Sequence, residues 1–287
     1  MKAIYKKEVK SYLTSMIGYV FIFFILLLEG IYFTAYNLQN AYPLFGTTLS
    51  AVTFIFLILV PVLTMKTIAE ERKQKTDQLL LTAPVSVSEI VLGKFLAVAT
   101  VYAIPVLIIC LYPMIMGKYG TVSYAMAYTA VLGFALLGFA QIAVGVFWSS
   151  VTENPVIAAV VTFIALFVCY MITGIGSLIP DSSMASLACY MLLVLLAAVW
   201  IYHMIRNLWI AAVIGIAGEA ALAITYVVKS TLFEGSIQKF LDVFNITSHF
   251  DNFTNGILDL QGVVYFLSVI IIFLVLTVQT ITKRRWN

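Results

Sequence analysis

The chain has 287 residues, of which 63% are hydrophobic and only 10% are charged. No soluble globular domain has this composition, and the net charge of +3 does not indicate nucleic acid as a partner. The three cysteines are an odd number without metal-ligand spacing, so we expect them to pack as small hydrophobic side chains.

Eight apolar stretches reach or approach the roughly 20 residues that a helix needs to cross a bilayer. They are Ile17–Ala35, Thr48–Met65, Ile90–Met116, Tyr124–Phe147, Pro155–Thr173, Met184–His203, Leu208–Val228 and Val263–Thr282. The pattern predicts an all-α polytopic membrane protein of about eight transmembrane helices, organised as one transmembrane domain over residues 1–287.

Lysine and arginine gather on one side of the predicted membrane. With the N-terminus inside, the inner segments hold thirteen of the sixteen basic residues; these segments are 1–16, 66–94, 148–154, 204–207 and 283–287. Cytoplasmic loops next to membrane spans favour Lys and Arg. We therefore predict a multi-pass protein of the cell membrane with both termini in the cytoplasm.

Residues 1–16 predict a helix that lies in the membrane interface. One helical face is apolar and another carries lysines; the two sets are Tyr5, Val9, Tyr12, Leu13 and Met16, and Lys2, Lys6 and Lys10. A plain positively charged anchor for the first span is the alternative.

Residues 66–94 are the only sizeable charged stretch between two spans. Thr67–Thr82 contains no Gly or Pro and predicts a short surface helix. After a turn at Ala83-Pro84, Ser86 and Glu89 have the spacing of a capping box, so a new helix is expected to start at Ser86.

The longest outer segment, residues 229–262, predicts an amphipathic helix on the outer membrane surface. Its apolar residues recur at helical spacing: Phe233, Ile237, Phe240, Leu241 and Phe244.

Groups that would support catalysis or ATP binding do not form a recognisable motif. Gly93-Lys94 and Gly117-Lys118 lack both the upstream glycine and the following hydroxyl residue of a P-loop. The two histidines, His203 and His249, fall on opposite sides of the predicted membrane. We therefore predict no catalytic, cofactor-binding or metal-binding residues in this chain.

Two carboxylates, Glu29 and Glu219, lie inside predicted spans, where charge is costly and commonly functional. Glu29 lies toward the outer end of its span, so its carboxyl group is expected to reach the membrane interface. Glu219 is about mid-span, which leaves three alternatives: protonation, pairing with a neighbouring helix, or a place in a polar pathway.

Two runs of residues resemble the ABC type-2 exporter permeases, and in particular their gliding-motility and copper-processing subgroup. The first run is Glu71-Arg72 … Thr76-x-x-Leu79-Leu80 … Pro84-Val85-Ser86 … Glu89-Ile90-Val91-x-Gly93-Lys94, and the second is His249-Phe250-Asp251-x-Phe253-x-x-Gly256-Ile257-x-Asp259. The family often has Gly where this chain has Lys75. The paired spans over 184–228 also exceed the six-helix core of the family.

The resemblance implies a permease subunit that couples ATP hydrolysis in a separate subunit to export. Its implied partners are a second permease chain, identical or related, two copies of a P-loop ATPase that bind ATP and Mg, and an accessory membrane subunit. The implied coupling residues are Ile68, Glu70, Glu71, Arg72, Lys73, Thr76, Leu79 and Leu80. Within this set, the run from Glu70 to Lys73 is expected to contact the ATPase; the alternative is a solvated loop.

An ATP-independent secondary transporter or channel is the competing function. Such a protein commonly has internal repeats, broken helices at the midplane and more intramembrane charge than this sequence carries. A membrane-embedded enzyme would need a polar catalytic cluster, for which no set of residues qualifies.

Overall fold

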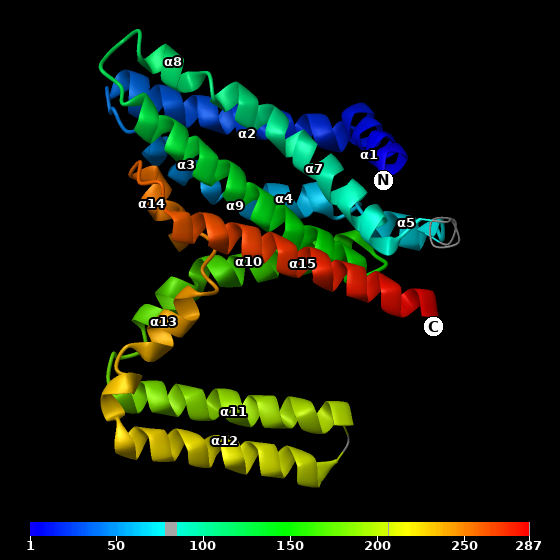
Figure 1. Cartoon of the computed structure of the whole chain (residues 1–287). Coiled ribbons are helices and arrows are strands. Elements are labelled where there is room, and N and C mark those ends of the chain that lie inside the picture. Colours follow the sequence, from blue (N-terminus) through cyan, green and yellow to red (C-terminus); the bar gives the residue numbers. More distant parts are fainter. Residues whose placement is uncertain (78–84, 206, 287) are drawn as a thin grey trace. The chain divides into compact units, whose positions relative to one another are not determined.

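The computed structural model describes residues 1–77, 85–205 and 207–286, and within these residues every regular element is helical (Figure 1). The first half contains α1 (Lys2–Thr14), α2 (Met16–Tyr32), the π-helix η1 (Phe33–Gln39), α3 (Phe45–Thr53), α4 (Phe56–Thr64), α5 (Ala69–Lys73), α7 (Val87–Ile109), α8 (Tyr112–Met116) and α9 (Tyr124–Val151). The second half contains α10 (Pro155–Ser177), α11 (Ser183–Ile205), α12 (Leu208–Val228), η2 (Ser230–Phe233), α13 (Ser236–Asp242), η3 (Ser248–Phe250), α14 (Asp251–Thr254) and α15 (Leu260–Trp286). The predicted all-α class is confirmed.

The spans also follow the prediction in number. Among the described residues, six helices are long and apolar enough to cross a membrane, and the total rises to eight if each of two bent helix pairs forms one span. One bent pair is Phe45–Thr53 with Phe56–Thr64, which lies where one span was expected over Thr48–Met65. The helix axis bends by 60° between its two halves.

By its internal packing, the chain divides into two compact units. Unit 1 comprises Met1–Val168 and Ile246–Asn287, and unit 2 comprises Cys169–Asn245. The outer segment expected as one amphipathic helix is divided between them: α13 belongs to unit 2, whereas α14 belongs to unit 1. Within the expected apolar face, Phe233 and Ile237 are buried but Phe240 and Phe244 are exposed.

Helix α9 is the centre of unit 1. In its most apolar stretch 72% of the residues are buried, a larger share than in any other candidate span. Helices α3, α4, α7, α14 and α15 pack around it. Small residues on α9 permit this: a Cβ at Gly138 would lie 2.2 Å from the Tyr102 ring, and one at Gly145 would lie 2.2 Å from Thr64.

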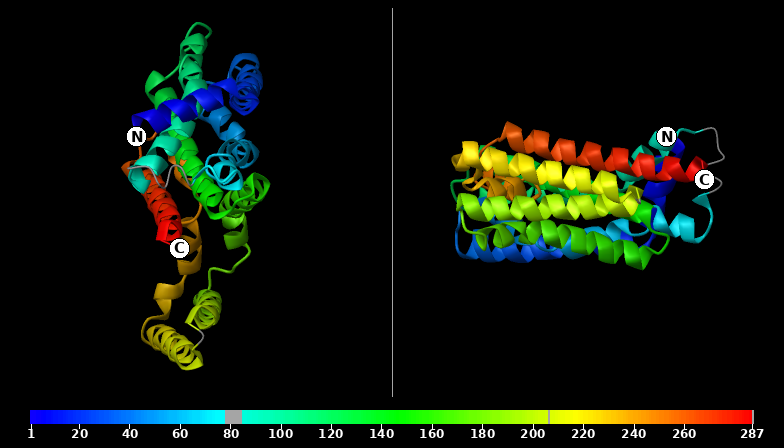
Figure 2. Two further views of the ribbon diagram at one scale, coloured as in Figure 1. Left: turned by 90° about the vertical axis from the view of Figure 1, so that its right-hand side faces the viewer. Right: turned by 90° about the horizontal axis from the view of Figure 1, so that it is seen from below.

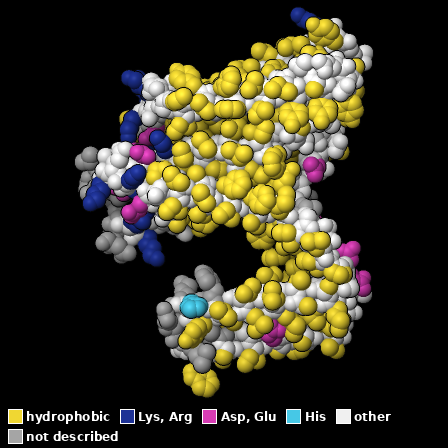
Figure 3. All heavy atoms as spheres, turned by 180° about the vertical axis from the view of Figure 1, so that it is seen from behind, with side chains coloured by type: hydrophobic (Ala, Val, Ile, Leu, Met, Phe, Trp, Pro, Cys, Tyr) yellow, Lys and Arg dark blue, Asp and Glu magenta, His cyan; other side chains and the backbone are white. Residues whose placement is uncertain are grey.

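Most of the charged residues of unit 1 gather at one end, which we call the charged end. Figures 1 and 2 show both chain termini there, beside α5. The space-filling view shows hydrophobic side chains over the flanks of unit 1, whereas most of its visible Lys and Arg lie at this end (Figure 3). A membrane helix bundle is expected to have this distribution, because its flanks contact lipid and its ends contact water.

We predict that Gly138→Ala destabilises the protein by about 1–3 kcal/mol, because the new methyl group overpacks the core against Tyr102. Tyr102 is fully buried and its hydroxyl donates to the Phe134 carbonyl at 2.6 Å, so the ring cannot move aside freely. The measurement is the thermal unfolding midpoint in detergent.

Gly174→Ala is the matched control for this substitution, since a methyl group at Gly174 would meet no neighbouring atom within 4 Å. It should leave the midpoint unchanged or raise it slightly, because alanine favours a helix. Equal midpoints for the two variants would contradict the close packing of α7 against α9.

Candidate functional site

The candidate site lies at the charged end, where α1, α5, α7 and the end of α9 meet. Helix α7 starts as the sequence predicts: Ser86 is its N-cap, and its hydroxyl oxygen accepts a hydrogen bond from the Glu89 amide at 3.3 Å. This start fixes Lys94 about two turns into α7. Lys94 is only 2% exposed.

The ammonium group of Lys94 has three partners, which matches its three donors. It lies 3.1 Å from Glu8 Oε1 on α1 and 2.8 Å from Glu71 Oε2 on α5, and it donates to the Thr67 carbonyl at 2.8 Å. Lys7 donates to the other Glu71 oxygen at 3.0 Å. We call Lys7, Glu8, Glu71 and Lys94 the charge cluster. It links α1, α5 and α7.

Within the charge cluster, Glu71 and Lys7 keep their charges over a wide pH range. Burial alone raises the pKa of Glu71, but Lys94 and Lys7 outweigh it and hold this pKa below its usual 4.5. Burial alone lowers the pKa of Lys7, but Glu71 and Glu8 raise it above 10.5. The Glu71 contribution to stability is therefore complete above pH 4.5 and lost as pH falls through the lowered pKa. The Lys7 contribution is complete below pH 10.5 and lost as pH rises through the raised pKa.

Tyr12 links α1 to the segment that precedes α5. Its hydroxyl donates to the Leu63 carbonyl at 3.2 Å and lies 3.0 Å from Thr67 Oγ1. Since the phenol has one proton, the Thr67 hydroxyl is the donor in the second bond. Burial raises the pKa of Tyr12 above its usual 10.0, so the phenol stays protonated as a donor.

Helices α5 and α9 cap one another. Ser149, near the end of α9, accepts hydrogen bonds from the amides of Ile68 and Ala69 at 3.1 Å each, and its hydroxyl donates to the Met65 carbonyl at 3.1 Å. These amides open α5, whose own N-cap residue supplies no side-chain bond. A helix N-terminus leaves such amides without intrahelical partners.

In return, Arg72 of α5 satisfies the C-terminal end of α9. Its guanidinium donates to the carbonyl of Ser150 and, at 3.1 Å, to that of Thr152. A cation at a helix C-terminus satisfies free carbonyls and complements the helix dipole. We call the Ser149 and Arg72 interactions together the reciprocal caps. They fix α5 to the central helix of unit 1.

Helix α5 is shorter than the helix predicted over Thr67–Thr82. It ends at Lys73 in a Schellman motif, in which the Thr76 amide donates to the Glu71 carbonyl at 2.9 Å and the Lys75 amide donates to the Arg72 carbonyl at 3.0 Å. Lys75 has φ +58°, a left-handed conformation that favours glycine. This is the position at which the resembling family often has Gly.

The predicted coupling residues divide into an inner and an outer set. Ile68 and Arg72 are buried, and Glu71 is half-buried and bound within the charge cluster. A contact of Glu71 and Arg72 with the ATPase stays a prediction. Lys73 and Thr76 are exposed, and Glu70 is partly exposed. Leu79, Leu80 and the predicted turn at Ala83-Pro84 lie outside the described residues.

Four site residues were missed in the sequence: Lys7, Glu8, Lys94 and Ser149. Glu8 lies between Ile4 and Tyr12 in the buried stripe of α1, whereas Met16, at the end of the predicted apolar face, is 81% exposed. The i, i+4, i+8 spacing of Ile4, Glu8 and Tyr12 was the available signal. A second signal was Lys94 itself. It lies within the third expected span, and no acidic residue of the same helix lies three or four positions from it.

The structure encloses Glu29, which differs from the expected position of its carboxyl group. Its span extends from Met16 to Gln39, because α2 continues as the π-helix, and this places Glu29 near the middle. The carboxyl group does not reach the interface; the residue is 0% exposed inside unit 1.

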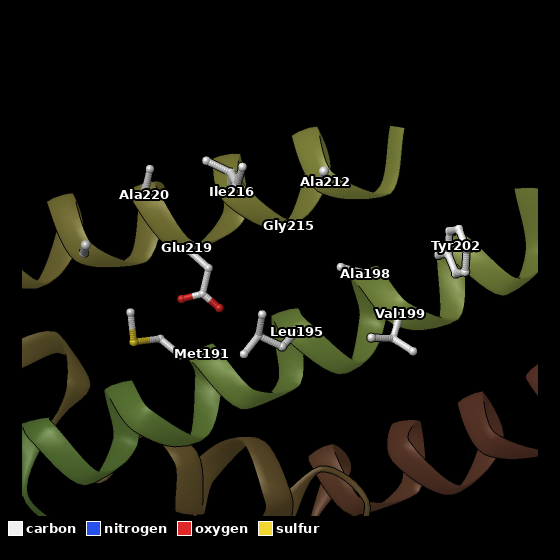
Figure 4. Close-up of a pocket in the computed structure, with 11 residues that line it drawn as sticks. Met191, Leu195, Ala198, Val199, Tyr202, Ala212, Gly215, Ile216, Glu219 and Ala220 are labelled. Atoms are coloured by element: carbon white, nitrogen blue, oxygen red, sulfur yellow. The ribbon is translucent and has the colours of Figure 1, made fainter. Parts of the chain in front are cut away.

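Glu219 lies in unit 2, on α12. Its carboxyl group points into a groove between α11 and α12, near Met191 and Leu195, in a cavity of about 610 Å³ with almost entirely apolar walls (Figure 4). Within the described part of the chain, Glu219 Oε1 is buried without a hydrogen-bond partner. The described residues contain no cluster of three or more His, Cys, Asp and Glu that could hold a metal ion.

We predict that Lys94→Met lowers stability by about 3–5 kcal/mol, because it leaves Glu8 and Glu71 close together without their shared cation. Adding Glu8→Gln to this variant should restore part of the loss. Thermal and denaturant unfolding in detergent measure the effect.

Arg284→Ala is the control for loss of an ion pair. Arg284 Nη1 lies 3.4 Å from Glu153 Oε1, and the two side chains are 43% and 68% exposed. Loss of this ion pair should therefore lower stability by less than about 1 kcal/mol. If Lys94→Met and Arg284→Ala lowered stability by the same amount, the charge cluster would not hold the helices together.

We further predict that Lys75→Gly stabilises the turn after α5 by about 1 kcal/mol, because glycine adopts the left-handed conformation without steric cost. Hydrogen exchange of the backbone amides at position 75 and at Thr76 should slow by roughly fivefold. Lys73→Gly, at a helical position of the same segment, should instead speed exchange. Faster exchange in Lys75→Gly would contradict the Schellman motif.

Comparison with known proteins places the whole arrangement in one family. The family model for ABC-2 family transporter proteins matches residues 2–284, which is nearly the whole chain. A comparison with curated proteins found no relative that matches the chain. The family match agrees with the helical bundle, the candidate spans and the absence of a P-loop motif from the sequence. The chain belongs to the ABC-2 family of transporter proteins and is a multi-pass membrane permease.

Proposed function

We propose that the chain is the transmembrane subunit of an ATP-driven exporter, in which a separate P-loop ATPase binds and hydrolyses ATP with Mg. The observation that carries this proposal is the two-sided arrangement of α5. Its inner side is held by the reciprocal caps and the charge cluster. Its outer side presents Lys73 and the turn through Thr76. A helix that only kept a loop in water would need no such anchoring.

The inner contacts can transmit a displacement of α5 into the membrane. Ser149 and Arg72 connect α5 to α9, the most buried span of unit 1. Lys94 connects α5 to α7 and α1 through Glu71 and Glu8. Since buried ion pairs and hydrogen-bonded helix ends resist separation, α5 is expected to move together with these helices.

The proposed docking surface consists of Lys73, Gln74, Lys75 and Thr76, all of them exposed. Its two lysines favour an acidic surface on the ATPase. Because ATP is cytoplasmic, the charged end faces the cytoplasm in this proposal, in agreement with the Lys and Arg bias of the sequence and with cytoplasmic termini.

The complete transporter requires more than this chain. We propose two permease chains, identical or related, since two ATPase copies need two docking surfaces. The late sequence run supports the gliding-motility and copper-processing subgroup, and an accessory membrane subunit is part of the same proposal. Neither ATP nor another cofactor is expected to bind to the permease itself.

The test compares two charge-reversal variants of the tagged chain, expressed beside its natural partners and purified in mild detergent. Lys73→Glu/Lys75→Glu should lose a P-loop ATPase that wild type retains at about one copy per chain, because both substitutions oppose the proposed acidic surface. Lys6→Glu/Lys10→Glu changes the same charge on the exposed side of α1 and should retain it. Mass spectrometry and gel densitometry measure the recovery.

A third variant, Ser149→Ala, separates docking from coupling. It should keep the ATPase but weaken the ATP-dependent change in hydrogen exchange of α9, because one of the reciprocal caps is lost. Purification of wild type without any ATPase, together with solute movement into liposomes without ATP, would overturn the proposal in favour of a secondary transporter or channel.

A further inference from the structure

Glu29 is an acidic group enclosed in the membrane-spanning part of unit 1. It lies near the middle of the span Met16–Gln39 and is 0% exposed. Among the residues that the structure describes, neither of its carboxyl oxygens has a hydrogen-bond partner. It thus differs from Glu8 and Glu71, whose oxygens are bound by lysines.

The groups around Glu29 provide no cation. Tyr102 of α7 and Tyr112 of α8 are the titratable groups that interact with it electrostatically. The Tyr102 hydroxyl already donates to the Phe134 carbonyl at 2.6 Å. Helices α3 and α4, which also pack on α2, contain no titratable residue.

The charged residues on the remaining neighbours are at the charged end. On α7, Lys94 precedes Tyr102 by about two turns and is held by Glu8 and Glu71. The acidic and basic residues of α1 lie before the first residue of α2. An ionised carboxylate enclosed without a cation or a donor is strongly disfavoured, so Glu29 carries a proton in this conformation.

The backbone next to Glu29 changes its helix type. The Phe33 amide bonds to the carbonyls of both Glu29 and Gly30, at the junction where α2 becomes the π-helix Phe33–Gln39. π-Helical segments are rare and often occur at functional sites. A shift of this junction along the chain would rotate Glu29 relative to the helices that enclose it.

We propose that Glu29 is a proton-binding site that links the conformation of the permease to pH. In the enclosed conformation the carboxyl group binds one proton. When α2 turns the group toward water, the O–H bond breaks, the proton passes to water and a carboxylate remains. The enclosed conformation therefore holds one more proton than the hydrated one, and falling pH favours it.

This proposal concerns the membrane interior and does not depend on an ATPase. It is tested on the purified full-length chain by infrared spectroscopy, in which a protonated carboxylic acid has a C=O band distinct from that of a carboxylate. At about pH 7, the wild-type spectrum should contain such a band that is absent from Glu29→Gln. The neutral Gln side chain resembles the protonated acid, so this variant should fold.

Glu219→Gln is the matched control, because it removes the other intramembrane carboxyl group, in unit 2; the Glu29 band should remain in its spectrum. If Glu29→Gln does not fold, Glu29→Asp can assign the band instead. This variant keeps a carboxylic acid at the site, and the frequency of its C=O band should shift. A wild-type spectrum without any band sensitive to either substitution would overturn the proposal.

The conformational link has its own measurement. Hydrogen exchange of the Phe33–Gln39 amides should be slower at about pH 5 than at about pH 9 after correction for intrinsic exchange rates, and Glu29→Gln should abolish this difference. An equal pH dependence in wild type and Glu29→Gln would show that the proton on Glu29 does not control the conformation of α2.

Discussion

The arrangement of unit 1 depends on where the positive charge of Lys94 is placed. This ammonium group is almost completely buried at the edge of the membrane-spanning region, a position that is unfavourable without full compensation. Compensation comes from helices far apart in sequence: Glu8 precedes the first span, and Glu71 follows the second. The requirement to satisfy one cation therefore determines which helix ends meet, and hydrophobic packing alone would not specify that choice, since lipid is as apolar as a leucine side chain.

The connection between α5 and α9 rests on a different principle. Five residues are too few for a stable isolated helix, because nucleation fixes several residues for a single hydrogen bond. Ser149 supplies the acceptor for the first amides of α5, and Arg72 supplies the donor for the last carbonyls of α9. Each helix end thus satisfies backbone groups of the other, and neither end is complete when they separate. Such mutual dependence makes a short helix behave as a rigid extension of a long one.

Much of this structure follows from the sequence, because the bilayer imposes simple requirements. Apolar stretches of sufficient length predicted the helical class, and Ser86 with Glu89 predicted the start of α7. The site was less predictable. Charged side chains are usually exposed, so Glu71 and Arg72 are read as surface groups, and only tertiary contacts reveal that Arg72 is buried and that Glu71 binds Lys94.

Local propensity failed in two further places. Lys75 is a good helix former in a left-handed conformation, so the helix predicted to reach Thr82 ends early. Glu29 was placed near a span end because the count of apolar residues stopped at the polar side chains of the π-helix. Polar residues do not end a membrane helix when they can turn toward the protein interior, as Asn37 does by bonding the Tyr42 carbonyl at 2.7 Å.

Unit 2 is a continuous segment of the chain, Cys169–Asn245, which in the sequence lies between the two parts of unit 1. It has internal contacts of its own: Tyr190 packs edge-on against Phe233 and Phe240, and Gln238 donates to the Ile179 carbonyl at 2.9 Å. Its two long helices, α11 and α12, form one hairpin. A hairpin contributes an even number of crossings, so parity is conserved: whether it is present or absent, α15 leaves the membrane on the same side. A segment of this kind leaves the orientation of every helix that follows it unchanged.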